Sequence, residues 1–271
     1  MWRKFLFACL SNLIISSPIF ANNREPVSYL GIENGLSNNS VTCIFQDHRG
    51  FMWFGTYDGL NRYDGYYFKV FRNHLNGSSS LPNNRIAAIT EDINKRLWIG
   101  TRSGVSIYDQ VTTTFSPVYY NVKGLASPQK ITSIVNQISS CSNGNMFIAT
   151  DNGLLFYKAK TNRATPVLLE NQFGYQAMAT ECDNAKKTWV YVREKGLFLY
   201  DERTQSLKPV SLQIKNGICL KYGADSTLWI GTDDGLYAYS IRTKTYTKKF
   251  SSGNRIVQLT QFDNTKERGS G

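Results

Sequence analysis

Residues 53–64 (WFGTYDGLNRYD) decide the fold, because this stretch recurs along the chain. Two close copies lie at residues 98–109 (WIGTRSGVSIYD) and 229–240 (WIGTDDGLYAYS). Two weaker copies lie between them, at residues 147–157 (FIATDNGLLFY) and in the segment around Val190 that leads into residues 196–201 (GLFLYD). A fixed internal period is the signature of a repeat architecture, and it indicates the fold more strongly than local secondary-structure propensity does.

The repeating unit is about forty residues long. The second glycine of each copy marks the register, and these marks are spaced by 45, 49, 43 and 39 residues. In the first copy, a β-branched and apolar run at residues 40–47 is followed by three further short strand patterns, separated by turns at residues 48–50 and 57–59. Four strands per unit with a recurring tryptophan are typical of a propeller blade.

We therefore predict an all-β fold, a β-propeller of four-stranded antiparallel blades, with five complete blades and the start of a sixth. The predicted blades are residues 36–80, 81–124, 125–170, 171–212 and 213–252, and residues 253–271 would begin the sixth. An incomplete propeller leaves its first and last blades without a neighbour. We expect the isolated chain to be marginally stable or to self-associate through these open blade edges.

The repeat residues themselves are predicted to be structural. A tryptophan on the second strand fills the space between blades, and the glycine two residues later lets backbones approach closely. The tyrosine that closes the third strand is assigned to the core as well, so none of these rings is interpreted as a sugar platform. The structural set is Trp53, Gly55, Gly59, Tyr63, Trp98, Gly100, Gly104, Tyr108, Gly153, Tyr157, Gly196, Tyr200, Trp229, Gly231, Gly235 and Tyr239.

Residues 1–21 have the composition of an export signal peptide. Arg3 and Lys4 precede an apolar stretch at residues 5–15, which is too short to span a bilayer, and small residues follow it. We predict cleavage near Ala21 and a periplasmic location for residues 22–271. No other segment is long and apolar enough for a membrane span, so none is expected in this chain.

The chain is basic, with a formal net charge of +11 from 31 Lys and Arg against 20 Asp and Glu. These charges are scattered rather than clustered, which disfavours a nucleic-acid partner.

Four cysteines follow the predicted cleavage point, and no pair has the spacing of a metal or redox motif. Cys43 and Cys219 lie in apolar runs and are predicted to be buried thiols. Cys141 and Cys182 lie near equivalent positions of neighbouring repeats, where an oxidising compartment allows a disulfide. The spacing leaves both this bond and two free thiols open. No cofactor and no metal site are expected.

The opening at residues 35–41 (GLSNNSV), followed by WFGT and GLNRYD, resembles the two-component regulator propeller repeat. A second opening of this kind lies at residues 81–86 (LPNNRI). The resemblance covers nearly all of residues 29–262. It implies the N-terminal periplasmic sensor region of a hybrid two-component histidine kinase, with breakdown products of complex polysaccharides as ligands.

The last residues depart from this pattern. Residues 254–260 open a sixth blade, but residues 262–271 replace the apolar, tryptophan-containing strand that the resemblance implies. We interpret this departure as an interrupted reading frame inside blade six, which would truncate the sensor. A deliberately shortened chain is the alternative.

Catalysis is not expected, because the sequence has no nucleophile elbow, metal-binding motif or phosphate-cradling loop. The carboxylate pairs Glu91-Asp92 and Asp233-Asp234 lie where turns explain them. Oligosaccharide sensing is therefore favoured. A free-standing secreted propeller that acts as a protein-interaction scaffold is the alternative, and a propeller lyase or hydrolase is disfavoured by the near absence of histidine.

The candidate ligand residues lie in the turn after the Gly-Thr pair of each copy. They are Tyr57, Arg102, Asp151 and Asp233. These residues differ from copy to copy, as ligand-contacting positions would. Unconstrained surface turns vary in the same way, and that is the simpler interpretation.

Overall fold

The computed structural model describes residues 28–74, 80–122, 124–161, 163–214, 216–223, 225–250 and 255–259. The predicted signal peptide with its cleavage point near Ala21 lies outside these residues. So do most of the predicted sixth-blade residues, including those interpreted as a frame interruption. No helix within the described ranges is long and apolar enough to cross a membrane.

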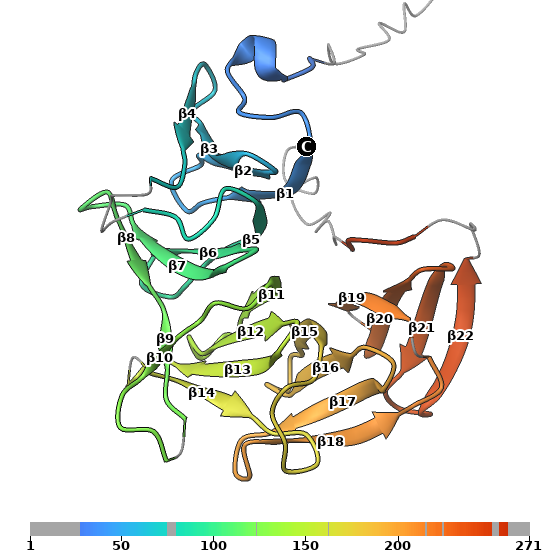
Figure 1. The fold of residues 1–271 in the computed structure, drawn as a ribbon. Coiled ribbons are helices and arrows are strands. Elements are labelled where there is room, and N and C mark those ends of the chain that lie inside the picture. Colours follow the sequence, from blue (N-terminus) through green and yellow to red (C-terminus); the bar gives the residue numbers. More distant parts are fainter. Residues whose placement is uncertain are drawn as a thin grey trace, which may run out of the picture. The chain divides into compact units, whose positions relative to one another are not determined.

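The described residues fold into five sheets that follow one another along the chain, preceded by a short 3-10 helix, η1 (Ile32–Asn34) (Figure 1). The first sheet consists of β1 (Val41–Gln46), β2 (Met52–Thr56), β3 (Gly59–Tyr63) and β4 (Phe68–Phe71). The second consists of β5 (Ile86–Glu91), β6 (Leu97–Thr101), β7 (Gly104–Asp109) and β8 (Thr114–Pro117).

The third sheet consists of β11 (Val135–Ser140), β12 (Met146–Thr150), β13 (Gly153–Lys158) and β14 (Arg163–Val167), with β9 (Tyr119–Tyr120) and β10 (Gln129–Lys130) added at its edge. The fourth consists of β15 (Ala177–Cys182), β16 (Thr188–Val192), β17 (Gly196–Asp201) and β18 (Ser206–Ser211). The fifth consists of β19 (Gly217–Tyr222), β20 (Thr227–Thr232), β21 (Leu236–Ser240) and β22 (Thr245–Phe250). The predicted all-β architecture of propeller blades is confirmed.

The third sheet differs from the four-stranded blade predicted for it. It has six strands, because β9 pairs in parallel with β14 at Ala164 and Tyr120, and β10 pairs with β9. The repeat interval before this blade is the longest of the four, and its extra residues form these two short strands. They cover the outer edge of β14, which would otherwise expose unpaired backbone groups.

The hydrophobic core lies between the sheets. Each of four apolar clusters joins residues of two consecutive sheets; the first, for example, contains Trp53 and Leu60 of the first sheet with Ile99 and Tyr108 of the second. The first strands of consecutive sheets also contact one another. Closure between the first and fifth sheets is not seen among the described residues.

One aromatic contact recurs across every pair of consecutive sheets. The ring on the second strand of one blade meets, edge to face, the tyrosine that ends the third strand of the next. The centroid distances are 5.6 Å for Trp53–Tyr108, 4.7 Å for Trp98–Tyr157, 5.0 Å for Phe147–Tyr200 and 6.2 Å for Trp189–Tyr239. Such pairs add specific geometry to the burial of apolar area.

This contact explains two of the three places where the structure departs from the predicted core. Trp229 is only partly buried, because no tyrosine of a following sheet lies against it within the described residues. Tyr63 is partly buried as well, since no preceding blade is described that could supply a ring. Tyr200 is partly buried although its contact with Phe147 is made. By contrast, Trp53 and Trp98 are fully buried.

Each buried tryptophan also has an aspartate partner, which the sequence analysis did not identify. The indole Nε1 donates to an aspartate six residues earlier, over 2.9 Å from Trp53 to Asp47 and 3.0 Å from Trp98 to Asp92. Trp189 donates to Asp183 over 3.0 Å. The same aspartates accept backbone N–H groups of the first turn, so one side chain ties that turn to the blade core.

At the boundary between consecutive blades, here called the seam, a small residue of one blade faces a large residue of the next. A Cβ on Gly55 would lie 2.7 Å from Cγ2 of Ile86, which opens the first strand of the next blade. In blade four the sizes are reversed, because Tyr191 replaces the glycine and Gly217 replaces the isoleucine, so that a Cβ on Gly217 would lie 2.4 Å from the tyrosine ring. The fourth repeat therefore matches the repeat pattern weakly because the large and the small residue have exchanged sides at its boundary with the fifth blade.

Residues 255–259 follow the fifth sheet and repeat the seam pattern. A Cβ on Gly231 would lie 2.7 Å from Cγ2 of Ile256, as on Gly55 from Ile86. The amide of Ile256 donates to the Thr232 carbonyl over 2.9 Å. Ile256 therefore lies against the fifth sheet as Ile86 lies against the first.

Cys141 and Cys182 form a disulfide between the third and fourth blades, with their Cα atoms 5.8 Å apart. Cys141 stands six residues before Phe147, the position that aspartate takes before Trp53, Trp98 and Trp189. Phenylalanine has no N–H to satisfy, so this position does not need an acceptor. Of the two alternatives that the sequence spacing left open, a disulfide or two free thiols, the structure has the disulfide.

Cys43 and Cys219 are free thiols that are partly buried rather than fully buried as predicted, and each packs between its glycine and the next blade. Burial raises the pKa of both thiols to about 11. At about pH 8 the thiolate fraction should be about 100-fold lower than in the unfolded chain, since only the thiolate reacts. We expect iodoacetamide labelling, followed by peptide mapping, to be slower by about this factor in native protein than in urea. Equal labelling rates would contradict the burial of these thiols.

Candidate functional site

The candidate residues lie in a turn whose shape is repeated in four blades. A threonine ends the second strand, and its hydroxyl donates to the carbonyl of the glycine three residues later, as from Thr101 to Gly104 over 2.9 Å. Gly104 has a φ of +107°, and a Cβ there would lie 1.9 Å from the Ile131 carbonyl oxygen. Only glycine suits such a position, so the turn keeps one shape while its two middle residues vary.

The backbone amide of the first middle residue of the turn is hydrogen-bonded to the segment that precedes the first strand of the same blade. The amide of Tyr57 donates to Ser40, that of Arg102 to Arg85, and that of Asp151 to Ile134, over 3.3, 3.1 and 3.0 Å. Beside each turn the first strand carries a register shift, a β-bulge, at the same place in all five blades. Bulges redirect side chains, and here they do so beside the variable turn residue.

Arg193 is the fourth-blade member of this series, and the sequence analysis missed it. Its amide donates to the Gln176 carbonyl over 2.9 Å. The turn of this blade is one residue longer, which places Trp189 seven rather than six residues before its glycine. Trp189 could have revealed it, because aligning Trp189 with Trp53 and Trp98 places Arg193 at the position of Tyr57 and Arg102.

The structure brings two of the predicted candidates together. Tyr57 and Arg102 line one pocket of about 350 Å³ at the ends of the first three blades, here called the Tyr57 pocket. Thr42, Arg85, Ile134 and Asn136 contribute further lining. Asp151 lies outside the lining although its amide contacts Ile134, and Asp233 forms an ion pair with Arg255 over 3.3 Å.

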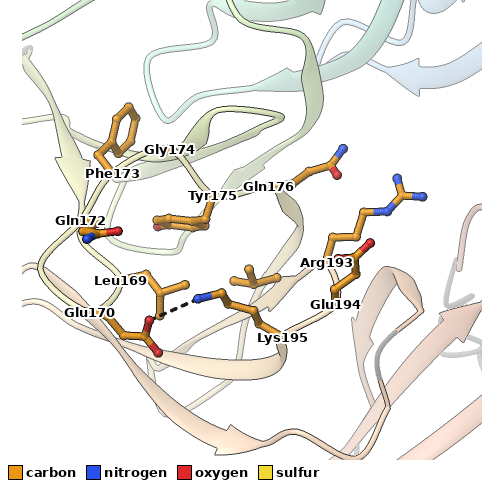
Figure 2. Close-up of a pocket in the computed structure, with 11 residues that line it drawn as sticks. Leu169, Glu170, Gln172, Phe173, Gly174, Tyr175, Gln176, Arg193, Glu194 and Lys195 are labelled. Atoms are coloured by element: carbon orange, nitrogen blue, oxygen red, sulfur yellow. Dashed lines mark hydrogen bonds and ion pairs between the residues drawn. The ribbon is translucent and has the colours of Figure 1, made fainter.

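A second pocket, of about 270 Å³, lies at the corresponding ends of the third and fourth blades (Figure 2). We call it the Tyr175 pocket, because the ring of Tyr175 lies in its middle and its hydroxyl donates to the Val167 carbonyl over 3.0 Å. Lys195 on one side pairs with Glu170 over 3.2 Å. Arg193 lines this pocket as Arg102 lines the first.

The charges of the two pockets differ. Arg85 and Arg102 line the Tyr57 pocket, and no acidic residue lines it. In the Tyr175 pocket, Arg193 and Lys195 are matched by Glu170 and Glu194. The Tyr57 pocket therefore carries an excess of positive charge that the Tyr175 pocket lacks.

The carboxylates that could have formed an acid/base pair are engaged elsewhere. Glu91 pairs with the His48 ring and accepts the His48 amide over 3.0 Å, while Asp92 holds Trp98 and Arg96. Lys248 and the Thr232 hydroxyl lower the pKa of Asp234 to about 2. A carboxyl group with a depressed pKa is a poor general acid. No group of three or more His, Cys, Asp or Glu side chains with metal-binding geometry occurs in the described part of the chain.

Comparison with known proteins identifies the repeats. The family described as "Two component regulator propeller" matches residues 35–58 and 80–103, which contain the two openings singled out above. The chain thus carries two-component regulator propeller repeats, and the inferred resemblance is confirmed. Over 47 residues, 17% of this chain, the sequence is 51% identical to histidine kinase P4 of Formosa agariphila, of which it covers 3%.

Two solved structures are similar over most of the chain. The first is the extracellular domain of BT3049 from B. thetaiotaomicron, assigned as a hybrid two component system, with 28% identity and a TM-score of 0.71 over 81% of this chain and 31% of that one. The second is the extracellular domain of BT4673 from the same organism, with 21% identity and a TM-score of 0.68 over 87% and 34%. This second likeness shows the fold alone. The chain spans about a third of these solved structures.

Proposed function

From the two-component regulator propeller repeats that it carries, we propose that the chain is the N-terminal part of a periplasmic sensor region whose propeller binds polysaccharide-derived oligosaccharides. The observation that carries this proposal is the likeness to the extracellular domain of BT3049, at 28% identity over 81% of the chain. The pockets at the blade turns support it, because each is lined by the variable first residue of such a turn, Arg102 in one pocket and Arg193 in the other. A signal peptide at residues 1–21, as predicted from the sequence, would deliver the chain to the periplasm.

We further propose that residues 253–271 begin a sixth blade. The support is Ile256, which lies against the fifth sheet as Ile86 lies against the first. A sixth sheet placed there would cover Trp229 and supply the tyrosine contact that this residue lacks in the described structure.

Kinase activity is named for the relative from Formosa agariphila and is not proposed for this chain. A lyase or hydrolase is not favoured by the described residues, since His48 is held by Glu91 and His74 lines neither pocket. A protein-interaction scaffold has no specific contact in its favour.

The proposal is tested by screening the purified full chain against a panel of neutral and acidic oligosaccharides in a thermal-unfolding assay. At a ligand concentration of about 100 times Kd, binding should stabilise the folded state by about 2.7 kcal/mol and raise the melting temperature. Monosaccharides at the same concentration serve as the control. The sensing proposal is abandoned if circular dichroism shows folded protein and no oligosaccharide shifts the transition.

A further inference from the structure

The positive charge of the Tyr57 pocket comes from two adjacent backbone positions. The Arg102 amide donates to the Arg85 carbonyl over 3.1 Å, so the two guanidinium side chains originate side by side. Both line the same pocket of about 350 Å³. Two guanidinium groups that line one pocket can together bind the oxygens of a carboxylate or of a sulfate ester through paired N–H donors.

Neither arginine is neutralised by the protein. Within the described ranges, Arg85 and Arg102 form no ion pair, whereas Arg72, Arg96 and Arg255 pair with Asp58, Asp92 and Asp233. Several other described arginines lack an ion pair as well. Arg85 and Arg102 differ from them in lining the same pocket, which contains no acidic residue.

An aromatic ring lies beside the two charges. The Cζ atom of Arg85 lies 4.2 Å from the centroid of the Tyr57 ring, and the Tyr57 side chain stays 50% exposed at the pocket. The face of the Tyr57 ring that Arg85 does not cover can pack against the C–H groups on one face of a sugar ring. Asn136 donates its amide to the Ala177 carbonyl over 2.7 Å, which leaves its side-chain oxygen as an acceptor for hydroxyl groups.

We propose that the Tyr57 pocket binds an acidic saccharide, with Arg85 and Arg102 on its anionic group and Tyr57 against its sugar ring. This inference rests on the proposed sensing function and adds the charge class and the place of the ligand. The Tyr175 pocket does not qualify, because its two cationic side chains are matched by two carboxylates.

The test measures the binding of four probes to the full chain by isothermal titration calorimetry. Trigalacturonate carries carboxylates, its methyl ester has the same skeleton without charge, neocarrabiose 4-sulfate carries a sulfate ester, and galactotriose is neutral. We expect trigalacturonate, the sulfated disaccharide or both to bind, and the methyl ester and galactotriose to bind at least tenfold more weakly. Affinity for the acidic probe should fall as salt is added, since the interaction is electrostatic.

Two variants locate the site. Arg102→Gln and Arg85→Gln should each weaken the acidic probe by about 10- to 100-fold, as expected for a charge-assisted hydrogen bond. Arg203→Gln is the matched control, because Arg203 is exposed in a turn of the fourth blade and lines neither pocket. The thermal midpoints of all three variants should equal that of the parent chain, which separates loss of binding from loss of fold.

The outcomes separate this inference from the sensing proposal. Binding of galactotriose or the methyl ester that both variants leave unchanged overturns the acidic-ligand inference and leaves sensing intact. Acidic-probe binding that survives both substitutions overturns the assignment to this pocket. If neither these probes nor any member of the oligosaccharide panel binds the folded chain, the sensing proposal fails, and this inference fails with it.

Discussion

Replacement of Trp98 by alanine is expected to lower the free energy of unfolding by about 3 to 5 kcal/mol. The side chain is fully buried, meets Tyr157 edge to face at 4.7 Å, and donates to Asp92 over 3.0 Å. Its removal would leave a large cavity between the second and third blades. Urea unfolding followed by circular dichroism measures the loss.

Trp229→Ala is the matched control, because it changes the same residue type at the same repeat position. Trp229 is only partly buried, and Gly223 stands where the other tryptophan-containing blades have an aspartate. We expect less than half of the Trp98 effect. Trp98→Phe, which keeps most of the volume but loses the N–H, should cost about 1 to 3 kcal/mol. Equal losses at Trp98 and Trp229 would contradict a role for the tyrosine and aspartate contacts.

Loss of the Cys141–Cys182 disulfide should destabilise the chain by about 4 kcal/mol on the chain-entropy estimate for a bond between residues 41 positions apart. The bond restricts the unfolded chain, and it also joins the third and fourth blades directly. The double variant Cys141→Ser, Cys182→Ser should shift the urea midpoint downward, and dithiothreitol should shift the parent chain by a similar amount.

The other two cysteines supply the control. Cys43→Ser with Cys219→Ser removes both described thiols and keeps the bond, so this variant should remain sensitive to dithiothreitol. The variant without Cys141 and Cys182 should be insensitive to it. If dithiothreitol shifts both variants equally, the reductant does not act through this bond.

The repeat predicted the blades because its key residues make the same local contacts in four of the five copies. Thr101 and Gly104 close the turn within one blade. The second and third strands pair in the same register in the first, second and fifth blades and are offset by one residue in the fourth. The periodicity along the chain was therefore sufficient to predict the five sheets. The six-stranded third sheet was not predicted, because β9 and β10 lie in the interval between repeats and match no repeat position.

The burial of Trp229 and Tyr63 could not be predicted from the repeat. Each depends on a ring from a neighbouring blade, so identical local sequence gives a buried side chain in one blade and a partly exposed one in another. The aspartate six residues before the tryptophan was visible in the sequence at Asp47, Asp92 and Asp183. It was not predicted, because it lies before the repeated stretch that defines the blades.

Two of the four residues predicted for the candidate site share one pocket. Tyr57 and Arg102 share a pocket, whereas Asp151 and Asp233 do not join them. Arg85 was not predicted, because it lies in the segment before the first strand of its blade, and the backbone hydrogen bond that places it beside Arg102 is not visible in the repeat. Such convergence of two segments depends on the β-bulge and on the twist of the sheet, neither of which leaves a sequence period.

The recurring aromatic contact has a direction, and this direction restricts the symmetry of any assembly. Each blade offers a second-strand ring to the next blade and a third-strand tyrosine to the previous one. Trp229 and Tyr63 are therefore complementary to each other and not to themselves. Copies of this chain that associate through these faces must join head to tail, as a closed ring or an open filament, and a two-fold symmetric dimer cannot form this contact.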